Sequence, residues 1–230
     1  MENTLVIALH GFLGLPEDWT PWRIQNAANK HFLAPNLWTD SELHCSLSLA
    51  DWTKVFLDFC RAKKAEGYHL ELWGYSMGGR LALGALVEDS ALFEKAVIIS
   101  ANPGLETENE RDSRLQRDLT WAEKFRHQNW ESLMTEWHSQ PVLLEPNTVD
   151  KPVVRKENKF DRDGLAEGLA HWSLGRQPNY WPQLPTISSS LEWHVGALDK
   201  TYVSIAERVK ERCSKVQLVV HPERGHRLIL

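Results

Sequence analysis

One serine in the sequence stands in a frame that suits a nucleophile. Ser76 is the middle residue of Gly-Tyr-Ser-Met-Gly at 74–78, between a short apolar run and a stretch rich in Leu and Ala. A serine on a sharp strand-to-helix turn needs glycine on either side, because the two backbones approach closely there. It also stands at the N-terminus of the helix, where the helix dipole favours an oxyanion or a carboxylate. This pattern predicts nucleophilic or proton-abstracting chemistry at Ser76.

A serine hydroxyl needs a base, and the base needs an acid that orients it. On a fold with such a turn, the partners follow in the chain order serine, acid, histidine. Asp199 comes shortly after one apolar run, and His226 follows the last apolar run 27 residues further along. That spacing fits one helix and one strand, so both side chains are expected at the sheet edge where Ser76 lies. We therefore predict a Ser76, His226 and Asp199 triad, with His221 as the nearest competing histidine.

Two backbone N–H groups are expected to form the oxyanion hole of this site. One comes from Met77, directly after the serine, and the other from Phe12, in the loop after the first apolar run. His10, in the same loop, is interpreted as a structural hydrogen-bonding residue. The ligand spacings of common zinc motifs and the glycine patterns of nucleotide-binding loops are absent from the sequence. We therefore expect no metal and no phosphate-binding loop.

Arginines near the predicted triad indicate the charge of the substrate. Arg80 lies one helical turn after Ser76, on the same side of the expected helix. The segment 103–185 adds further arginines, namely Arg114, Arg117, Arg155 and Arg176. Guanidinium groups pair with carboxylates through two parallel hydrogen bonds, which suits a small polyanionic substrate. The alternative is that these arginines are solvated or pair with acidic neighbours such as Asp118.

The composition excludes several classes of protein. The chain has 230 residues, a net charge of -5 and 42% hydrophobic residues, which fits one large globular domain or a domain with an insertion. No overall basic field exists to bind a nucleic acid. Three cysteines without C-x-x-C spacing fit reduced thiols, and no signal peptide or membrane-spanning run is evident. We expect a soluble cytoplasmic protein, a monomer or small homo-oligomer, that binds no membrane.

The elements that must position these residues alternate along the chain. Strand-like apolar runs occur at 4–9, 69–73, 95–100, 191–195 and 216–221, with helical patterns at 49–67, 80–87 and 203–212. This alternation predicts a mostly parallel sheet flanked by helices. From 103 to 185 only helical stripes recur, so this segment is interpreted as a helical cap inserted into a core formed by 1–102 and 186–230. With the serine turn, the pattern predicts an α/β-hydrolase fold.

Longer segments of the chain resemble one family. The resemblance rests on His10–Gly14, Gly74–Arg80, Asn102–Leu105 with Glu110, Arg111 and Arg114, and Glu136–Val142. In these segments the chain resembles the 2-succinyl-6-hydroxy-2,4-cyclohexadiene-1-carboxylate synthases of menaquinone biosynthesis. The serine turn is common to many α/β-hydrolases, whereas the other segments are more specific to this family.

The resemblance implies a carbon–oxygen lyase on a hydrolase fold that works without a cofactor. Such an enzyme expels pyruvate from a succinyl-substituted hydroxycyclohexene polycarboxylate by proton abstraction and elimination. Ser76, activated by its partners, would take the substrate proton. The resemblance places Arg80, Arg114 and Arg155 on the substrate carboxylates and Tyr75 and Trp137 along the pocket. Two features depart from the family pattern: the match around Arg155 is loose, with Arg162 as a substitute, and no final helix follows His226 in the sequence.

Two other functions stay open at this stage. A preformed triad suits acyl transfer as well as proton abstraction, so a carboxylesterase, thioesterase or carbon–carbon bond hydrolase is the second hypothesis. The third is a binding protein that keeps the serine turn without activity. Arg80 and Arg114 discriminate between the first two, because a neutral ester does not require them. Labelling of Ser76 by a serine-reactive phosphonate would discriminate against the third.

Overall fold

The computed structural model describes residues 3–144 and 154–230. Within these residues six strands form one sheet in the order β2-β1-β3-β4-β5-β6, and each neighbouring pair is parallel. The strands are β1 (Thr4–Leu9), β2 (His31–Leu33), β3 (His69–Tyr75), β4 (Lys95–Ile99), β5 (Ser190–Gly196) and β6 (Gln217–His221). The expectation of a mostly parallel sheet is confirmed.

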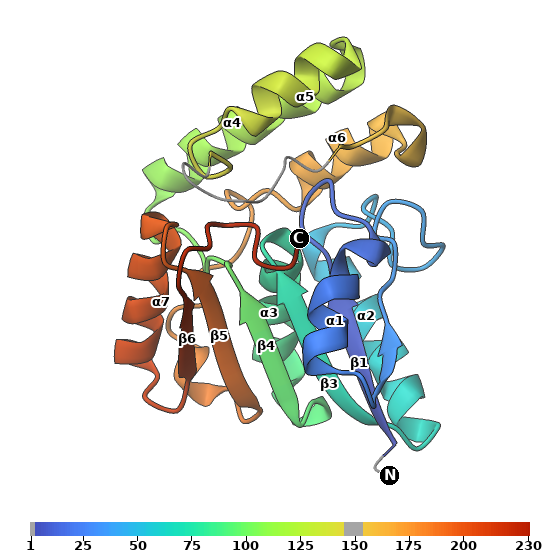
Figure 1. The fold of residues 1–230 in the computed structure, drawn as a ribbon, viewed down its shortest axis with the longest axis vertical. Coiled ribbons are helices and arrows are strands. Elements are labelled where there is room, and N and C mark those ends of the chain that lie inside the picture. The colour runs from blue at the N-terminus through green and yellow to red at the C-terminus, as the bar shows by residue number, and fades with distance from the viewer. Residues whose placement is uncertain (1–2, 145–153) are drawn as a thin grey trace.

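Helices cover both faces of this sheet (Figure 1). α2 (Leu49–Ala65), α3 (Met77–Asp89) and α7 (Lys200–Arg212) pack on one face, and α1 (Thr20–Asn26) packs on the other with residues 228–230. Side chains of β1 alternate between the two cores: Leu5, Ile7 and Leu9 face α2 and α3, whereas Val6 and Ala8 face α1. A strand buried on both faces is apolar at nearly every position, as β1 is from Leu5 to Leu9, which is why it was recognisable in the sequence.

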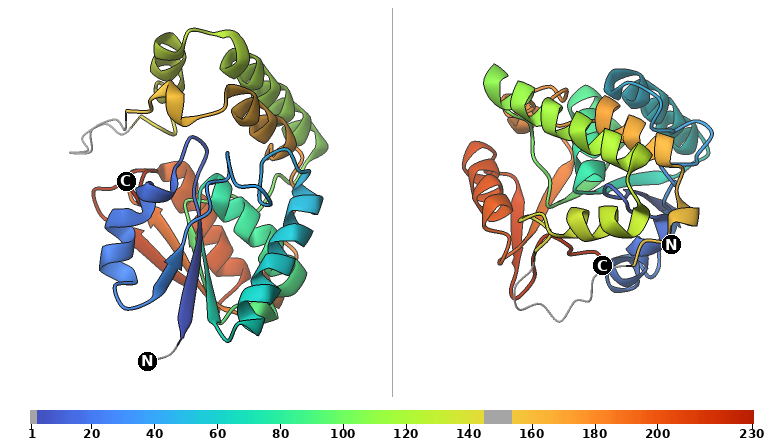
Figure 2. Two further views of the ribbon diagram at one scale, coloured as in Figure 1. Left: turned by 90° about the vertical axis from the view of Figure 1, so that its right-hand side faces the viewer. Right: turned by 90° about the horizontal axis from the view of Figure 1, so that it is seen from above.

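Three further helices lie above the carboxyl ends of the strands. They are α4 (Glu108–His127), α5 (Trp130–His138) and α6 (Arg162–His171), all from the chain between β4 and β5. In Figure 2 they form a layer of their own over the sheet edge. Ala122, Phe125 and Leu133 are buried in this layer, which agrees with the helical stripes in the sequence. The inserted helical cap is therefore confirmed, while its limits at 103 and 185 stay predictions.

β2 and α1 are not predicted by the sequence pattern. β2 has only three residues, lies at the edge of the sheet and is partly exposed, so its apolar pattern is too short to recognise. β3 and α3 are longer than expected: β3 continues to Tyr75 and α3 begins at Met77. Ser76 alone thus separates strand from helix. None of the helices in the described ranges is long and apolar enough to cross a membrane.

Candidate active site

Ser76 forms the whole turn between β3 and α3. Its backbone takes φ 53° and ψ -112°, which non-glycine residues rarely adopt, and its N–H donates to the carbonyl of Ile99 on β4 (2.8 Å). Glycines beside the turn are required by packing. A Cβ on Gly74 would lie 2.5 Å from the carbonyl oxygen of Gly78, and a Cβ on Gly78 would overlap the carbonyl oxygen of Leu9. The close packing of β1, β3 and α3 therefore holds Ser76 in its strained conformation.

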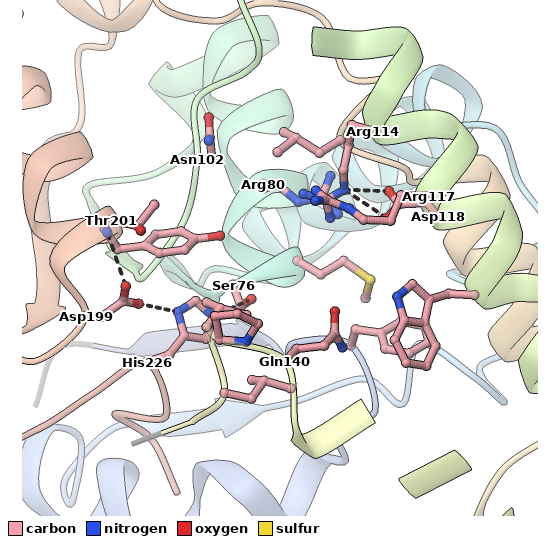
Figure 3. A pocket seen from close by; sticks show the side chains of 18 of the residues that line it. Ser76, Arg80, Asn102, Arg114, Arg117, Asp118, Gln140, Asp199, Thr201 and His226 are labelled. Carbon is pink, nitrogen blue, oxygen red and sulfur yellow. Dashed lines mark hydrogen bonds and ion pairs between the residues drawn. The ribbon is translucent and has the colours of Figure 1, made fainter. Parts of the chain in front are cut away.

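In the predicted triad, His226 is within hydrogen-bonding distance of both Ser76 and Asp199 (Figure 3). Ser76 Oγ lies 3.0 Å from His226 Nε2, and His226 Nδ1 lies 2.7 Å from Asp199 Oδ2. The His226 and Asp199 side chains are only 4% and 6% exposed, so water hardly competes for the contact between them. In this arrangement a histidine can take the serine proton while the carboxylate orients the imidazole ring.

Local structure fixes the acid and the base. Asp199 is the N-cap residue of α7, and its Oδ1 accepts a hydrogen bond from the backbone N–H of Tyr202 (3.3 Å). The loop that carries His226 is braced by Arg224, whose Nη2 donates to the carbonyls of Arg227 and Leu228 (3.3 Å each). Capping and this brace thus keep Asp199 on His226 and His226 on Ser76.

The other two histidines singled out in the sequence have structural places. His221 lies 3.0 Å from His194, Nε2 to Nδ1, and packs against Trp22, so it does not contact Ser76. His10 is fully buried, with Nδ1 2.8 Å from the carbonyl oxygen of Gly11 and Nε2 accepting from the N–H of Leu37 (3.1 Å). These two bonds require a neutral ring, and burial lowers the pKa of His10 to about 4.

His10 makes the protein sensitive to acid, because the unfolded chain binds a proton near pH 6.5 that the folded chain excludes until about pH 4. Acid therefore favours unfolding across this range. We expect the drop in unfolding free energy between pH 7 and pH 4.5 to be smaller by about 2 kcal/mol in His10→Gln than in the wild type. Urea unfolding at both pH values measures this difference. His127→Gln, at an exposed position, is the control, and an equal drop in all three proteins would contradict the prediction.

The triad opens into a pocket of about 700 Å³, a size typical of small-molecule sites. Predicted residues that line it besides the triad are Phe12, Tyr75, Met77, Arg80, Arg114 and Trp137. Trp137 on α5 packs on the Phe12 ring, with 4.9 Å between centroids, and Tyr75 packs on His226 at 5.8 Å. Met77 is the first residue of α3, so its N–H has no carbonyl partner within the helix. The amides expected to form the oxyanion hole thus belong to residues of this pocket.

Arg80 is a buried cation whose direct partners are neutral. The residue is 8% exposed, and its guanidinium donates to Gln177 Oε1 (3.1 Å) and to the carbonyl of Trp172 (2.8 Å). Among the described residues, no carboxylate forms an ion pair with it. Burial, followed by the positive charge of Arg114, lowers the pKa of Arg80 to about 10, so the group stays charged at neutral pH. A buried charge without a counter-ion is costly, and a bound carboxylate would relieve that cost.

Two arginines of α4 add to this charge. Arg114 Nε donates to both carboxylate oxygens of Asp118 (2.8 and 2.9 Å), and Asp118 also accepts from Ser173 Oγ (2.7 Å). Arg117 lines the pocket and makes no hydrogen bond or ion pair with any residue in the described ranges. Figure 3 shows the guanidinium groups of Arg80, Arg114 and Arg117 on one side of the pocket, beside Asp118. Positive charge exceeds negative charge on this side.

The structure places Arg155 in a different setting from the other predicted substrate contacts. Its guanidinium forms two hydrogen bonds with the Asp18 carboxylate (2.9 and 2.7 Å), and both side chains are 8% exposed. Arg155 is not among the described residues that line the pocket, and neither are Arg162 and Arg176. Arg162 instead donates to the carbonyl of Phe125 (2.6 Å). Of the cap arginines singled out in the sequence, the two on α4 are thus the ones that line the pocket.

The pocket is also lined by polar side chains that were not predicted as site residues from the sequence. They are Asn102, Gln140, Ser173, Lys200, Thr201 and Tyr202. Tyr202 could have been found, because it follows Asp199 by three residues and so falls in the first turn of the helix that Asp199 caps. Gln177 gives no such signal, since only the fold brings it to Arg80. In the part of the chain that the structure describes, no group of three or more His, Cys, Asp or Glu side chains could hold a metal ion.

Known proteins are similar to this chain in sequence and in fold. The sequence model of the alpha/beta hydrolase family matches residues 6–230. A 2-succinyl-6-hydroxy-2,4-cyclohexadiene-1-carboxylate synthase from Photorhabdus laumondii is 32% identical over 215 residues, which cover 90% of this chain and 75% of that protein. The chain belongs to this synthase family, within the α/β-hydrolases. The family resemblance found in the sequence is therefore confirmed.

Further members and solved structures agree with this assignment. A Haemophilus influenzae protein, described as a putative synthase of the same family, is 27% identical and covers 96% of this chain and 89% of its own length. The structure of MenH from S. aureus has a TM-score of 0.87 at 22% identity, covering 98% of this chain and 87% of that one. A thermophilic esterase from Thermogutta terrifontis has a TM-score of 0.72 at 17% identity, covering 98% and 84%. These two structures confirm the α/β-hydrolase fold.

Proposed function

We propose that this protein is a lyase of menaquinone biosynthesis that eliminates pyruvate from a succinyl-substituted hydroxycyclohexene polycarboxylate. The product would be 2-succinyl-6-hydroxy-2,4-cyclohexadiene-1-carboxylate, the compound named in the family to which the chain belongs. Arg80 is the observation that carries the proposal. It is a buried guanidinium that lines the same pocket as the triad and bonds only neutral acceptors among the described residues.

The charges and surfaces of the pocket fit a cyclic polycarboxylate. Arg80, Arg114 and Arg117 contribute three positive charges to one side, and Asp118 contributes one negative charge. Carboxylates held there would be oriented by guanidinium groups, while the aromatic rings of Phe12 and Trp137 offer an apolar wall to the carbon ring. A neutral substrate would leave the positive charges uncompensated.

In the proposed reaction Ser76 acts as the base after His226 has accepted its proton. The serine oxygen takes a proton from a ring carbon, and the electron pair of that C–H bond forms a new ring double bond. The carbon–oxygen bond to the three-carbon leaving group breaks with its electron pair on oxygen, and the pyruvate enolate that departs takes up one proton on carbon to become pyruvate. The amides of Met77 and Phe12 would stabilise the oxyanion that develops on the substrate. The reaction is redox-neutral and needs no cofactor.

A serine hydrolase is the second candidate, because the strained turn and the 3.0 Å contact between Ser76 and His226 suit acyl transfer equally well. In that mechanism Ser76 would attack an ester or thioester carbonyl rather than a proton. Arg80 separates the two candidates. An enzyme for neutral esters gains nothing from a buried cation beside its nucleophile.

The experiment that tests the proposal follows pyruvate. We expect the purified protein to release one pyruvate for each molecule of the cyclohexene precursor consumed, measured with a lactate dehydrogenase coupled assay. A short-chain aryl ester serves as the control substrate, and labelling of Ser76 by a serine-reactive phosphonate shows whether the nucleophile is active. Ester hydrolysis that requires Ser76 but not Arg80, without any pyruvate, would overturn the lyase in favour of a hydrolase.

A further inference from the structure

Tyr202 is tied to both partners of Ser76. Its backbone N–H donates to Asp199 Oδ1 (3.3 Å), and its ring packs on the imidazole of His226 with 4.6 Å between centroids and an interplanar angle of 59°. The residue is half-buried and lines the pocket. Because the backbone is fixed by the capping contact and the ring by His226, the position of the phenol hydroxyl is fixed as well.

The hydroxyl of Tyr202 has no hydrogen-bond partner among the residues that the structure describes. It makes no hydrogen bond with any residue in the ranges 3–144 and 154–230. Several side-chain atoms in these ranges are fully buried without a hydrogen-bond partner there, and the Tyr202 hydroxyl is not one of them. The hydroxyl must therefore retain some accessible surface, and the pocket is the space that this side chain lines. A well-positioned donor that the protein leaves unsatisfied is available to a ligand.

Charges around the phenol define what that ligand would be. Arg114, Arg80 and Arg117 all stabilise negative charge at this position, while Asp199 opposes it. Burial has the largest effect and raises the pKa of Tyr202, so the phenol is a neutral hydrogen-bond donor at physiological pH. The Tyr202 ring packs on His226, and the three arginines line the same pocket, so an anionic acceptor is favoured beside the hydroxyl.

We propose that the Tyr202 hydroxyl is a further substrate-binding group, which donates a hydrogen bond to a carboxylate that the arginines also bind. The carboxylate would then be held from α7 as well as from α3 and α4, which fixes its distance from Ser76. This deepens the proposed function, on which the identity of the substrate rests, but the contact itself requires only a carboxylate ligand. Ligands without an acceptor at this point would be disfavoured, because the arginines and the hydroxyl would stay unsatisfied.

Tyr202→Phe is a clean test, because it keeps the ring on His226 and the N–H on Asp199 and removes only the hydroxyl. We expect kcat/KM for pyruvate release to fall about 10- to 100-fold, mainly through a higher KM, which is the size of effect of a hydrogen bond to a charged group. Tyr68→Phe is the matched control: Tyr68 is partly buried beside the start of β3, at the opposite end of the strand from Ser76. Urea unfolding of both variants checks that their stability matches the wild type.

A binding measurement separates this proposal from the proposed function. Citrate, a tricarboxylate, is titrated into each protein while the tryptophan fluorescence is followed, to which Trp121, Trp137 and Trp172 of the pocket contribute. We expect the dissociation constant to rise about tenfold in Tyr202→Phe and to stay unchanged in Tyr68→Phe. If the wild type releases no pyruvate but shows this pattern, the lyase proposal fails and the hydroxyl contact stands. Unchanged citrate binding together with unchanged kinetic constants in Tyr202→Phe would overturn the contact.

Discussion

Replacing Ser76 with alanine is expected to lower kcat for pyruvate release by about a thousandfold or more. In the proposed reaction the serine oxygen removes the proton, and His226, 3.0 Å from that oxygen, only accepts the proton of the serine, so the loss of the hydroxyl removes the base that would contact the substrate. KM is expected to change little, because the arginines that would bind the substrate are untouched. Steady-state kinetics with the pyruvate assay give both constants.

Alanine at this position also tests whether the turn is kept only for structure. The φ of 53° is no easier for alanine than for serine, so the folded state should be equally stable in both proteins. Ser204→Ala, on an exposed position of α7, is the control and should match the wild type in every constant. A loss of less than tenfold in Ser76→Ala would show that Ser76 is not the base. His226 acting directly on the substrate would then be the alternative.

Replacing Arg80 with methionine is expected to lower kcat/KM for the polycarboxylate by about a hundredfold or more, because a buried charge that contacts a carboxylate is worth several kcal/mol when one partner is removed. Methionine fills a similar volume and carries no charge. Any hydrolysis of a neutral aryl ester should be nearly unaffected. The two substrates measured side by side therefore report the charge requirement separately from the triad.

Stability provides the second readout for Arg80. Burying an uncompensated guanidinium is unfavourable, which offsets the loss of its hydrogen bonds to Gln177 and the Trp172 carbonyl. We therefore expect the unfolding free energy of Arg80→Met to lie within about 1 kcal/mol of the wild type or above it. Arg176→Met removes an exposed guanidinium that does not line the pocket and should leave both activity and stability unchanged. Equal losses with the ester and the polycarboxylate would contradict a role in binding carboxylates.

Much of the fold and of the triad could be predicted from local chemistry. β1 is apolar from Leu5 to Leu9 because both its faces are buried, and the glycines at 74 and 78 indicate a turn whose flanking positions have no room for a Cβ. Asp199 and His226 could be predicted because each follows a strand, and the carboxyl ends of parallel strands meet at one edge of a sheet. The short edge strand β2 could not be predicted, because three partly exposed residues are too few to show an apolar pattern.

The tertiary structure alone decided which cations belong to the pocket. Arg114 and Arg155 look alike in the sequence. Arg155 forms an ion pair with Asp18 and does not line the pocket, whereas Arg114 lines the pocket and donates from its Nε to Asp118. The physical reason is that ion pairing depends on which groups meet in space, and the partner of Arg155 lies 137 residues away along the chain. Strands, helices and turns are determined largely by residues that are neighbours in the sequence. The balance of charge in a pocket is set by residues that only the folded chain brings together.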